Sequence, residues 1–485
     1  MSRFPVPRNQ KAPVIIICGP KGSGKSTFAK LLTNRLLSPK GQSNLNRTSP
    51  AKNTTGVAIL DLDPGQPEYS VQGQLSLIHL TSLNFGPPFT HPIPGEPNRV
   101  IRAHTVGAVT PSFDPALYME CVLDLVAHYR NLVSTVPKCP LVINTPGWIL
   151  GTGLEILVEL ITKCWPTEVI YMSQDGPQEV VDTLRDAAKT TPVLTLPSQG
   201  SEYTTRTAAH LRTMQAMSYF HLKPSNQDSL TWGGGPITSL PPWEVQYSGQ
   251  GAGILGIMCY GEQPPPSLLL EAINGSLLAV VVVDDKSAIP GWSAGPEDVG
   301  PIEEGLSDLD PSDWQSQNRK MQTPLIVRTP EENLPYFNPA NTVSLSPNHS
   351  HCLGLALLRG VDIPRQRLQI LTPISPKVIQ EINEEGKSIV LVSGKLDTPG
   401  WAYVEELVQS DVTEKENRKA KTGDNEGDAE GMGEETGEMI DASGEKQTGV
   451  QDVPWVEKLR GSQGRGIGAR VWRVRRDLGR STDGE

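Results

Sequence analysis

The sequence predicts an α/β fold with a parallel sheet flanked by helices, followed by a β-rich domain and a disordered acidic linker. Residues 14–222 alternate short apolar runs with helical stretches, which is typical of parallel strands covered on both faces. Short strands and Gly/Pro turns dominate 223–410, and 411–450 is rich in Gly, Glu and Lys with few large apolar residues. The expected domains are therefore 1–222, 223–410, the linker 411–450 and a basic, aromatic tail at 451–485.

The first strand and the first helix flank a phosphate-binding loop. Val14–Cys18 is a β-branched run typical of a buried parallel strand. The sequence that follows matches G-x-x-x-x-G-K-[ST] and continues with apolar residues at helical spacing. We expect Lys25 to bind the β/γ-phosphates of ATP and Ser26 to hold Mg²⁺, so the sheet is that of a P-loop NTPase. The nucleotide-binding residues expected from the motif are Gly19, Pro20, Lys21, Gly22, Ser23, Gly24, Lys25, Ser26 and Thr27.

The elements after this helix continue the alternation as far as residue 222. A Pro-rich loop through Pro97 is expected between the second strand and the next helix. The expected strands are Gly56–Leu62, Leu141–Thr145, Glu168–Met172 and Val193–Leu196, and the expected helices are Pro115–Leu132, Gly153–Cys164, Pro177–Ala188 and Arg206–Leu222.

Charge, cysteine content and hydropathy limit the kinds of substrate, metal site and location that are expected. The net charge is −11, but 411–445 alone holds twelve acids and four bases, so the remainder carries only −3. The acidic balance therefore does not exclude a polynucleotide substrate. Six cysteines without a C-x-x-C pair argue against zinc and against a disulfide framework. No apolar run reaches the roughly 18–20 residues of a membrane span, and the N-terminus lacks the apolar segment of a secretory signal, so we expect no membrane association.

Two aspartates and a glutamine follow the second strand in ILDLDPGQPEY, which begins at residue 59. Residues two apart share one face of a strand, so Asp61 and Asp63 are both expected to point to the nucleotide. A kinase that acts on a hydroxyl group needs a base for its proton. Asp63 is the better placed base, and Asp61 suits the water shell of the metal. Gln66 is suited to a water, to the metal or to the substrate RNA. The alternative is a pair of solvated turn acids.

A regulatory GTPase is the rival reaction for a P-loop. Its D-x-x-G-Q motif would need an acid at position 62, where Leu62 stands. The NTPG stretch at 144–147 has Asn144 where that class has aspartate, and no N-K-x-D motif occurs. These departures favour a kinase over a GTPase.

Four motifs in order give the chain a family resemblance. They are GPKGSGKST, DLDPGQPE, TPGW and RTAAHLRTMQAMSYFH. Together they resemble the polynucleotide 5′-hydroxyl kinases, most of all the ribosomal-RNA-processing branch and less the sister branch of mRNA 3′-end and tRNA processing. The resemblance implies transfer of the γ-phosphate of ATP, or another NTP, to the 5′-hydroxyl end of RNA. It also implies a location in the nucleus and nucleolus, in a complex with the endoribonuclease that cuts a pre-rRNA spacer.

The resemblance also assigns roles to particular residues. The family's clasp for RNA falls on Thr145, Pro146, Gly147 and Trp148, where the Trp148 ring offers a stacking platform for a terminal base. Its alternative is a half-buried core tryptophan. The family's lid arginine, which stabilises the transferring phosphoryl group, falls on Arg212, with Arg206 as second choice.

The resemblance further implies a domain before the P-loop strand that helps to hold the nucleotide base. Thirteen residues precede Val14, so that domain is either absent or outside this sequence.

Two further questions stay open at this point. A non-catalytic ATP-binding scaffold is an alternative to the kinase, because a nucleotide site can persist after turnover is lost. The tail at 451–485 contains Trp455, Trp472 and several arginines, which are residue types of interface hot spots. We expect it to dock on the nuclease partner, with a last strand of the β-rich domain or an RNA-binding basic patch as alternatives.

Overall fold

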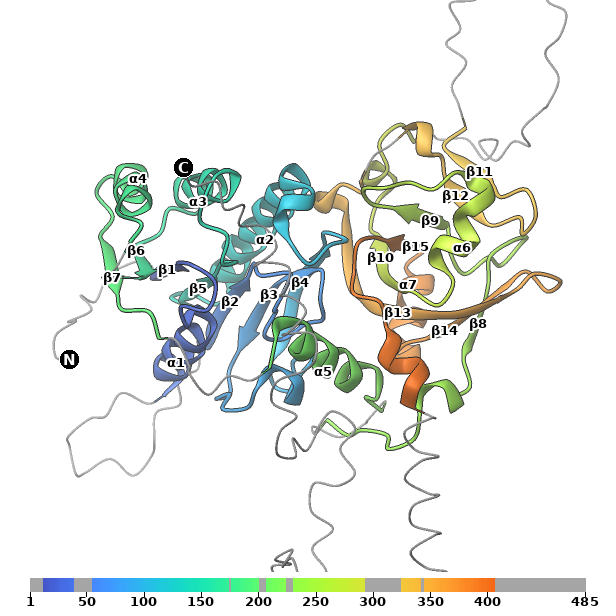
Figure 1. The fold of residues 1–485 in the computed structure, drawn as a ribbon, viewed down its shortest axis with the longest axis horizontal. Coiled ribbons are helices and arrows are strands. Elements are labelled where there is room, and N and C mark those ends of the chain that lie inside the picture. The colour runs from blue at the N-terminus through green and yellow to red at the C-terminus, as the bar shows by residue number, and fades with distance from the viewer. Residues whose placement is uncertain are drawn as a thin grey trace, which may run out of the picture.

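The structure is a computed structural model that describes residues 12–38, 55–173, 176–199, 206–223, 230–292, 324–341 and 344–405. Figure 1 shows two sheets side by side, one built from each half of the described chain. The expected acidic linker and the basic, aromatic tail lie outside the described residues. No helix of the described part is both long and apolar enough to cross a membrane.

The first sheet has seven strands in the order β4-β3-β2-β5-β1-β6-β7. Strands β2, β5, β1, β6 and β7 are parallel to their neighbours in this run, as predicted. Their carboxyl ends meet at one edge, which is where α/β sheets bind ligands. The strands are β1 (Val14–Cys18), β2 (Val57–Asp61), β3 (Gln74–Leu80), β4 (Arg99–Thr105), β5 (Leu141–Asn144), β6 (Glu168–Met172) and β7 (Val193–Leu196).

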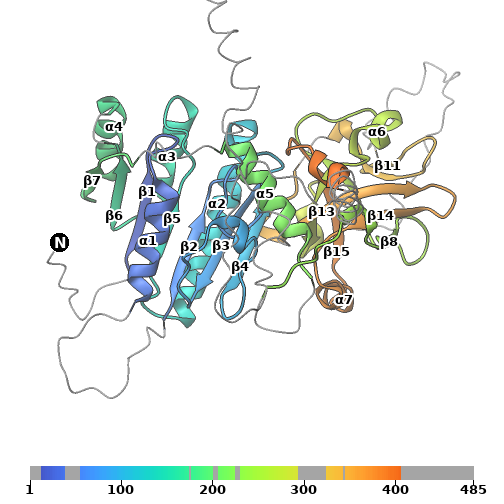
Figure 2. The same cartoon turned by 60° about the horizontal axis from the view of Figure 1, so that its bottom comes forward.

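Helices cover both faces of the first sheet (Figure 2). Alternate residues of β1 explain this arrangement, because Ile15 and Ile17 pack on α1 while Ile16 packs on the opposite side with α2 and α3. A strand buried on both faces reads as a continuous apolar run, as β1 does. The helices of this half are α1 (Lys25–Leu37), α2 (Pro115–Thr135), α3 (Thr152–Cys164), α4 (Gln178–Ala188) and α5 (Ala208–Phe220).

The prediction of one Pro-rich loop after β2 is wrong for two stretches. β3 and β4 are strands, antiparallel to β2 and to each other, and they extend the sheet beyond its parallel part. Strand β3 was not predicted because it contains the polar residues Gln74, Ser76 and His79. They are buried, since β3 pairs with a strand on each side. The prolines lie mainly in the connection between β3 and β4.

The second sheet has eight strands in the order β11-β12-β9-β15-β10-β13-β14-β8. Most pairs are antiparallel, and β9 is parallel to both of its neighbours. Its strands are β8 (Trp243–Gln246), β9 (Gly256–Cys259), β10 (Leu277–Val283), β11 (Ile326–Arg328), β12 (Pro335–Phe337), β13 (Ser350–Asp362), β14 (Arg367–Leu371) and β15 (Ser388–Ser393), and its helices are α6 (Leu269–Ile273) and α7 (Pro376–Glu384).

The two sheets share one core and a group of charges. A single cluster of buried apolar residues includes strands of both sheets. Beside it, Arg102 of β4 binds Asp284 at 2.8 Å and lies 3.4 Å from the carboxylate of Asp124 on α2. We call Arg102, Asp124 and Asp284, together with the surrounding His104, His128, His351 and Lys387, the Arg102 cluster.

Candidate active site

The phosphate loop connects β1 to α1 at the carboxyl edge of the first sheet. Gly24 has φ of +93°, and a Cβ there would meet the Gln199 side chain at 3.1 Å, so glycine suits this position. Lys25 opens α1 and is 6% exposed, and its Nζ donates a hydrogen bond to the Pro20 carbonyl at 2.9 Å. Burial lowers the Lys25 pKa, while the charge of Asp63 opposes the change. The lysine therefore sits where an anionic ligand would relieve its desolvation.

Asp61 ends β2 and is almost fully buried. Its carboxylate accepts a hydrogen bond from the Glu68 N–H at 2.6 Å and another from Asn144 Nδ2 at 3.1 Å. The same Nδ2 lies 3.4 Å from Ser26 Oγ. Burial raises the Asp61 pKa to about 7, although these hydrogen bonds oppose the rise. A carboxylate that is costly to ionise next to a phosphate loop is typical of a functional site.

The residues around Asp61 fit Mg²⁺. The serine hydroxyl of Ser26 and the Asp61 carboxylate are oxygen donors, and Asn144 Oδ1 is buried without a hydrogen-bond partner among the described residues. Mg²⁺ prefers oxygen ligands and keeps several waters, so one or two protein groups beside phosphates suffice. Within the described residues no three His, Cys, Asp or Glu side chains are placed to hold a metal by themselves. The set therefore suits a metal that arrives with a nucleotide.

Asp63 lies two residues beyond Asp61, in the turn after β2. Its Oδ1 accepts hydrogen bonds from the N–H groups of Gly65 at 3.0 Å and Gln66 at 3.2 Å. Burial raises the Asp63 pKa, while those hydrogen bonds and the charges of Lys25 and Arg212 oppose the rise. The charges of two other predicted site residues, Lys25 and Arg212, therefore affect the pKa of Asp63.

Helix α5 supplies the predicted lid arginine. Thr207 caps the helix, and Gln215 donates hydrogen bonds to the carbonyls of Pro67 and Ser70, which fixes α5 against the loop after β2. Arg212 lies one turn before Gln215 and makes two hydrogen bonds to Asp397 from the second half of the chain. Arg206, the second choice, precedes the cap and lies outside the helix.

The predicted clasp for RNA is divided in the structure. Thr145 is fully buried and donates from Oγ1 to the Ile17 carbonyl at 3.0 Å, so its side chain supports β1 and leaves any RNA contact to residues 146–148. Gly147 approaches the phosphate loop closely, since a Cβ there would lie 2.7 Å from Lys21 Cα. Trp148 is half-buried and packs over Gly153 at the start of α3.

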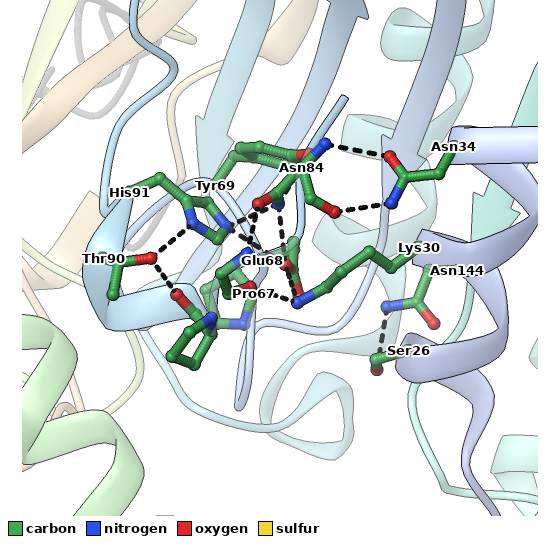
Figure 3. A network of polar contacts seen from close by, with 12 residues as sticks. Ser26, Lys30, Asn34, Pro67, Glu68, Tyr69, Asn84, Thr90, His91 and Asn144 are labelled. Carbon is green, nitrogen blue, oxygen red and sulfur yellow. Dashed lines mark hydrogen bonds and ion pairs between the residues drawn. The ribbon is translucent and has the colours of Figure 1, made fainter. Parts of the chain in front are cut away.

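A polar network beside the phosphate loop was not foreseen (Figure 3). Lys30 of α1 binds the Glu68 carboxylate at 2.6 Å, which His91 also contacts at 3.0 Å. Asn84 exchanges hydrogen bonds with Asn34 of α1 and donates to Glu68 at 3.2 Å. The network ties the connection between β3 and β4 to α1 and to the segment that holds Asp61.

Some of the residues that were not predicted lie within motifs that the sequence analysis had recognised. Glu68 lies inside the DLDPGQPE motif and Asn144 inside the NTPG stretch, so both could have been proposed as site residues from the sequence. Asn34, Asn84 and His91 meet only through the tertiary fold, and no local pattern marks them.

Comparison with known proteins finds a family match in the first half of the chain. Residues 19–222 match the family model described as "mRNA cleavage and polyadenylation factor CLP1 P-loop". A solved structure of a wild-type Clp1p–Pcf11p complex is 16% identical, covering 80% of this chain and 75% of that one, with a TM-score of 0.46.

The curated relatives extend over most of the chain. A protein of Gibberella zeae named polynucleotide 5′-hydroxyl-kinase GRC3 is 42% identical over 97% of this chain and 61% of its own length. Proteins of the same name from Aspergillus oryzae and Aspergillus terreus are 43% and 44% identical over 84% and 83% of this chain. The chain spans 50–61% of the length of these relatives. These matches confirm the resemblance inferred from the four motifs. The chain is therefore similar over most of its length to the polynucleotide 5′-hydroxyl-kinases named GRC3, and its residues 19–222 match the family model of the CLP1 P-loop.

Proposed function

We propose that the chain transfers the γ-phosphate of ATP to the 5′-hydroxyl end of RNA. One observation carries the proposal beyond the names of the relatives: the positive charges of Lys25 and Arg212, which come from opposite ends of the first half, both oppose the rise of the Asp63 pKa. A hydroxyl kinase needs these three groups together, two cations for the phosphates and one base for the hydroxyl.

Each residue has a distinct part in this reaction. Lys25 binds charge on the β/γ-phosphates, and Arg212 stabilises the charge that develops on the equatorial oxygens. Asp63 accepts the proton of the RNA hydroxyl, and its raised pKa brings it toward the working pH. Ser26 and Asp61 would hold Mg²⁺, which supplies charge neutralisation at the phosphate oxygens. The exposed part of the Trp148 ring stacks on the terminal base.

The direct test is incubation with γ-labelled ATP and RNA that ends in a 5′-hydroxyl. We expect label on the RNA end, none on RNA that already carries a 5′-phosphate, and a loss of at least about 100-fold in Lys25→Ala. Lys377→Ala is the matched control, because Lys377 is 83% exposed on α7, and it should keep the wild-type rate.

Other results would select the alternatives. ATP binding without label on RNA would favour the non-catalytic scaffold. Release of phosphate from GTP without RNA, with little use of ATP, would favour the regulatory GTPase.

We propose that the chain acts in pre-rRNA spacer processing in the nucleolus, with a spacer endoribonuclease as partner, on the support of the family resemblance. Fluorescent tagging should place it in the nucleolus, and the nuclease should co-purify with the full chain and less with a chain lacking 451–485. Co-purification with the mRNA 3′-end or tRNA processing machinery instead would favour the sister branch.

A further inference from the structure

The segment 394–398, which follows β15 of the second sheet, enters the first half of the molecule. The Lys395 N–H donates to the Gly107 carbonyl at 2.6 Å, and Lys395 pairs with Ala108 as an isolated parallel bridge. Gly394 lies against Gly107 so closely that a Cβ on it would fall 2.1 Å from the Gly107 carbonyl oxygen. A backbone approach of this kind fixes the position of the residues that follow.

Asp397 lies in this segment and faces the candidate site. Its N–H donates to the Gln72 side chain at 3.3 Å, and Gln72 is buried in the loop after β2. Its carboxylate accepts one hydrogen bond from Arg212 Nε at 2.6 Å and one from Arg212 Nη2 at 3.3 Å. The Arg212 side chain is 15% exposed and that of Asp397 is 35% exposed, so the pair is shielded but not sealed.

The contact with Asp397 occupies one edge of the Arg212 guanidinium group and leaves its other edge available. Nε and Nη2 of Arg212 bind Asp397, whereas Nη1 has no hydrogen bond within the described residues. A guanidinium presents five donors in a fixed plane, so a carboxylate on one edge sets the direction of the rest. Helix α5, which carries Arg212, is fixed against the loop after β2 by the Gln215 hydrogen bonds to Pro67 and Ser70, and the charge of Arg212 opposes the rise of the Asp63 pKa in that loop. Holding a long side chain in advance removes part of the entropy cost of using it.

We propose that Asp397 is a positioning residue that orients Arg212 for the transferring phosphoryl group, so that the second half of the chain completes the active site. This inference rests on the proposed kinase function. The competing explanation is an ordinary ion pair that only joins the two halves. An ion pair of that kind would change stability but not the rate of the chemical step.

The variants Asp397→Asn, Asp397→Glu, Arg212→Ala and the double variant Arg212→Ala/Asp397→Asn separate the two explanations. We expect Asp397→Asn to lower kcat by about 10–100-fold, the range for loss of a group that orients an active-site ligand, with little change in KM for ATP or RNA. Asp397→Glu should recover part of the rate. The double variant should be no slower than Arg212→Ala, because the effect of Asp397 passes through Arg212.

Glu244→Gln is the matched control, since the Glu244–Arg367 pair is also partly exposed and lies within the second sheet. It should leave kcat unchanged. A wild-type kcat in Asp397→Asn, a rate loss equal to that of Glu244→Gln, or additive losses in the double variant would overturn the proposal.

A second measurement does not depend on turnover. The ¹H–¹⁵N signal of Arg212 Nε, assigned by its absence in Arg212→Lys, should exchange slowly with water in the full chain and rapidly in Asp397→Asn. If the wild type transfers no label to RNA, the kinase proposal fails by itself. Rapid exchange of this signal in the wild type would instead reject the Asp397 inference.

Discussion

The molecule contains two clusters of charge whose electrostatic states are opposite. In the candidate site, burial raises the Asp61 pKa to about 7, raises the Asp63 pKa and lowers that of Lys25, so each group is poorly compensated. In the Arg102 cluster, burial also favours the neutral acids, but His104 and His128 lower the pKa of Asp124, and His351 and Arg102 lower the pKa of Asp284. Both clusters are built from carboxylates and cations, but only in the second do the protein's own groups lower the pKa of the acids.

The difference indicates what each cluster is for. A cluster that the fold has neutralised stabilises the contact between the two sheets. A cluster that remains unfavourable persists where a ligand supplies the missing charge, as a nucleotide with Mg²⁺ would do here. The comparison predicts that substitutions in the site change activity and that substitutions in the Arg102 cluster change stability.

The largest effect is expected for Asp63→Asn. The amide keeps the shape but no longer accepts a proton, so the rate of label transfer should fall by about 10²–10⁴-fold. ATP binding, measured by calorimetry, should stay close to that of the wild type. If Asp61→Asn removes the transfer and Asp63→Asn retains it, the roles of the two acids are reversed.

Arg102→Met should mainly reduce stability. It leaves Asp124 and Asp284 without their shared cation, and breaking a buried ion pair costs about 3–5 kcal/mol in the free energy of unfolding. Chemical denaturation measures this change. The control is Arg185→Met, whose partner Asp182 is 58% exposed, and its effect should stay within about 1 kcal/mol. Equal effects of the two substitutions would remove the distinction between the clusters.

The contribution of the acids to folding stability should change with pH in opposite directions in the two clusters. The folded-state pKa of Asp61 is raised from 3.8 to about 7, so its protonated form favours folding at low pH and that advantage is lost as pH rises toward 7. Asp61→Asn should therefore be more stable than the wild type at pH 7, by on the order of 3 kcal/mol, and no more stable below about pH 4.

Asp284→Asn provides the opposite case. Its lowered pKa contributes stability above the unfolded value of 3.8, which is lost as pH falls further. This variant should be less stable than the wild type at pH 7, and the difference should shrink in acid. Thermal unfolding from pH 3 to pH 8 measures both variants, and parallel curves would contradict the comparison.

The smallest effect is expected for Trp148→Ala, at the margin of the site. Loss of stacking on a terminal base should weaken binding of RNA by about 1–3 kcal/mol, seen as a higher KM for RNA with little change for ATP. A fall in melting temperature without a kinetic change would assign Trp148 to the core alone.

Much of the first sheet was predictable from local pattern. Strands β1, β6 and β7 have the expected bounds, because an apolar strand between helices is recognisable without its partners. Strands β3 and β4 were missed because their pairing, not their composition, buries their polar residues. The expected domain boundaries and site roles stay predictions.

In the candidate site, too, some residues could be predicted from local pattern and others could not. Lys25, Asp61, Asp63 and Arg212 were proposed from motifs, and the structure brings them to one edge of the sheet. The Glu68–His91 contact and the carboxylate on Arg212 join residues far apart in the chain, and no local pattern encodes such pairs. The sequence thus identifies groups that a reaction requires, whereas the groups that orient them depend on the completed fold.

The position of Asp397 has a consequence for the order of events during synthesis. It follows Arg212 by 185 residues, so translation at about 5–20 residues per second adds it roughly 10–40 s after the arginine. The phosphate loop and its acids leave the ribosome long before that carboxylate exists. On the proposed mechanism, a nascent chain would carry the phosphate loop well before Arg212 has its partner, and phosphoryl transfer by an unfinished protein would be disfavoured.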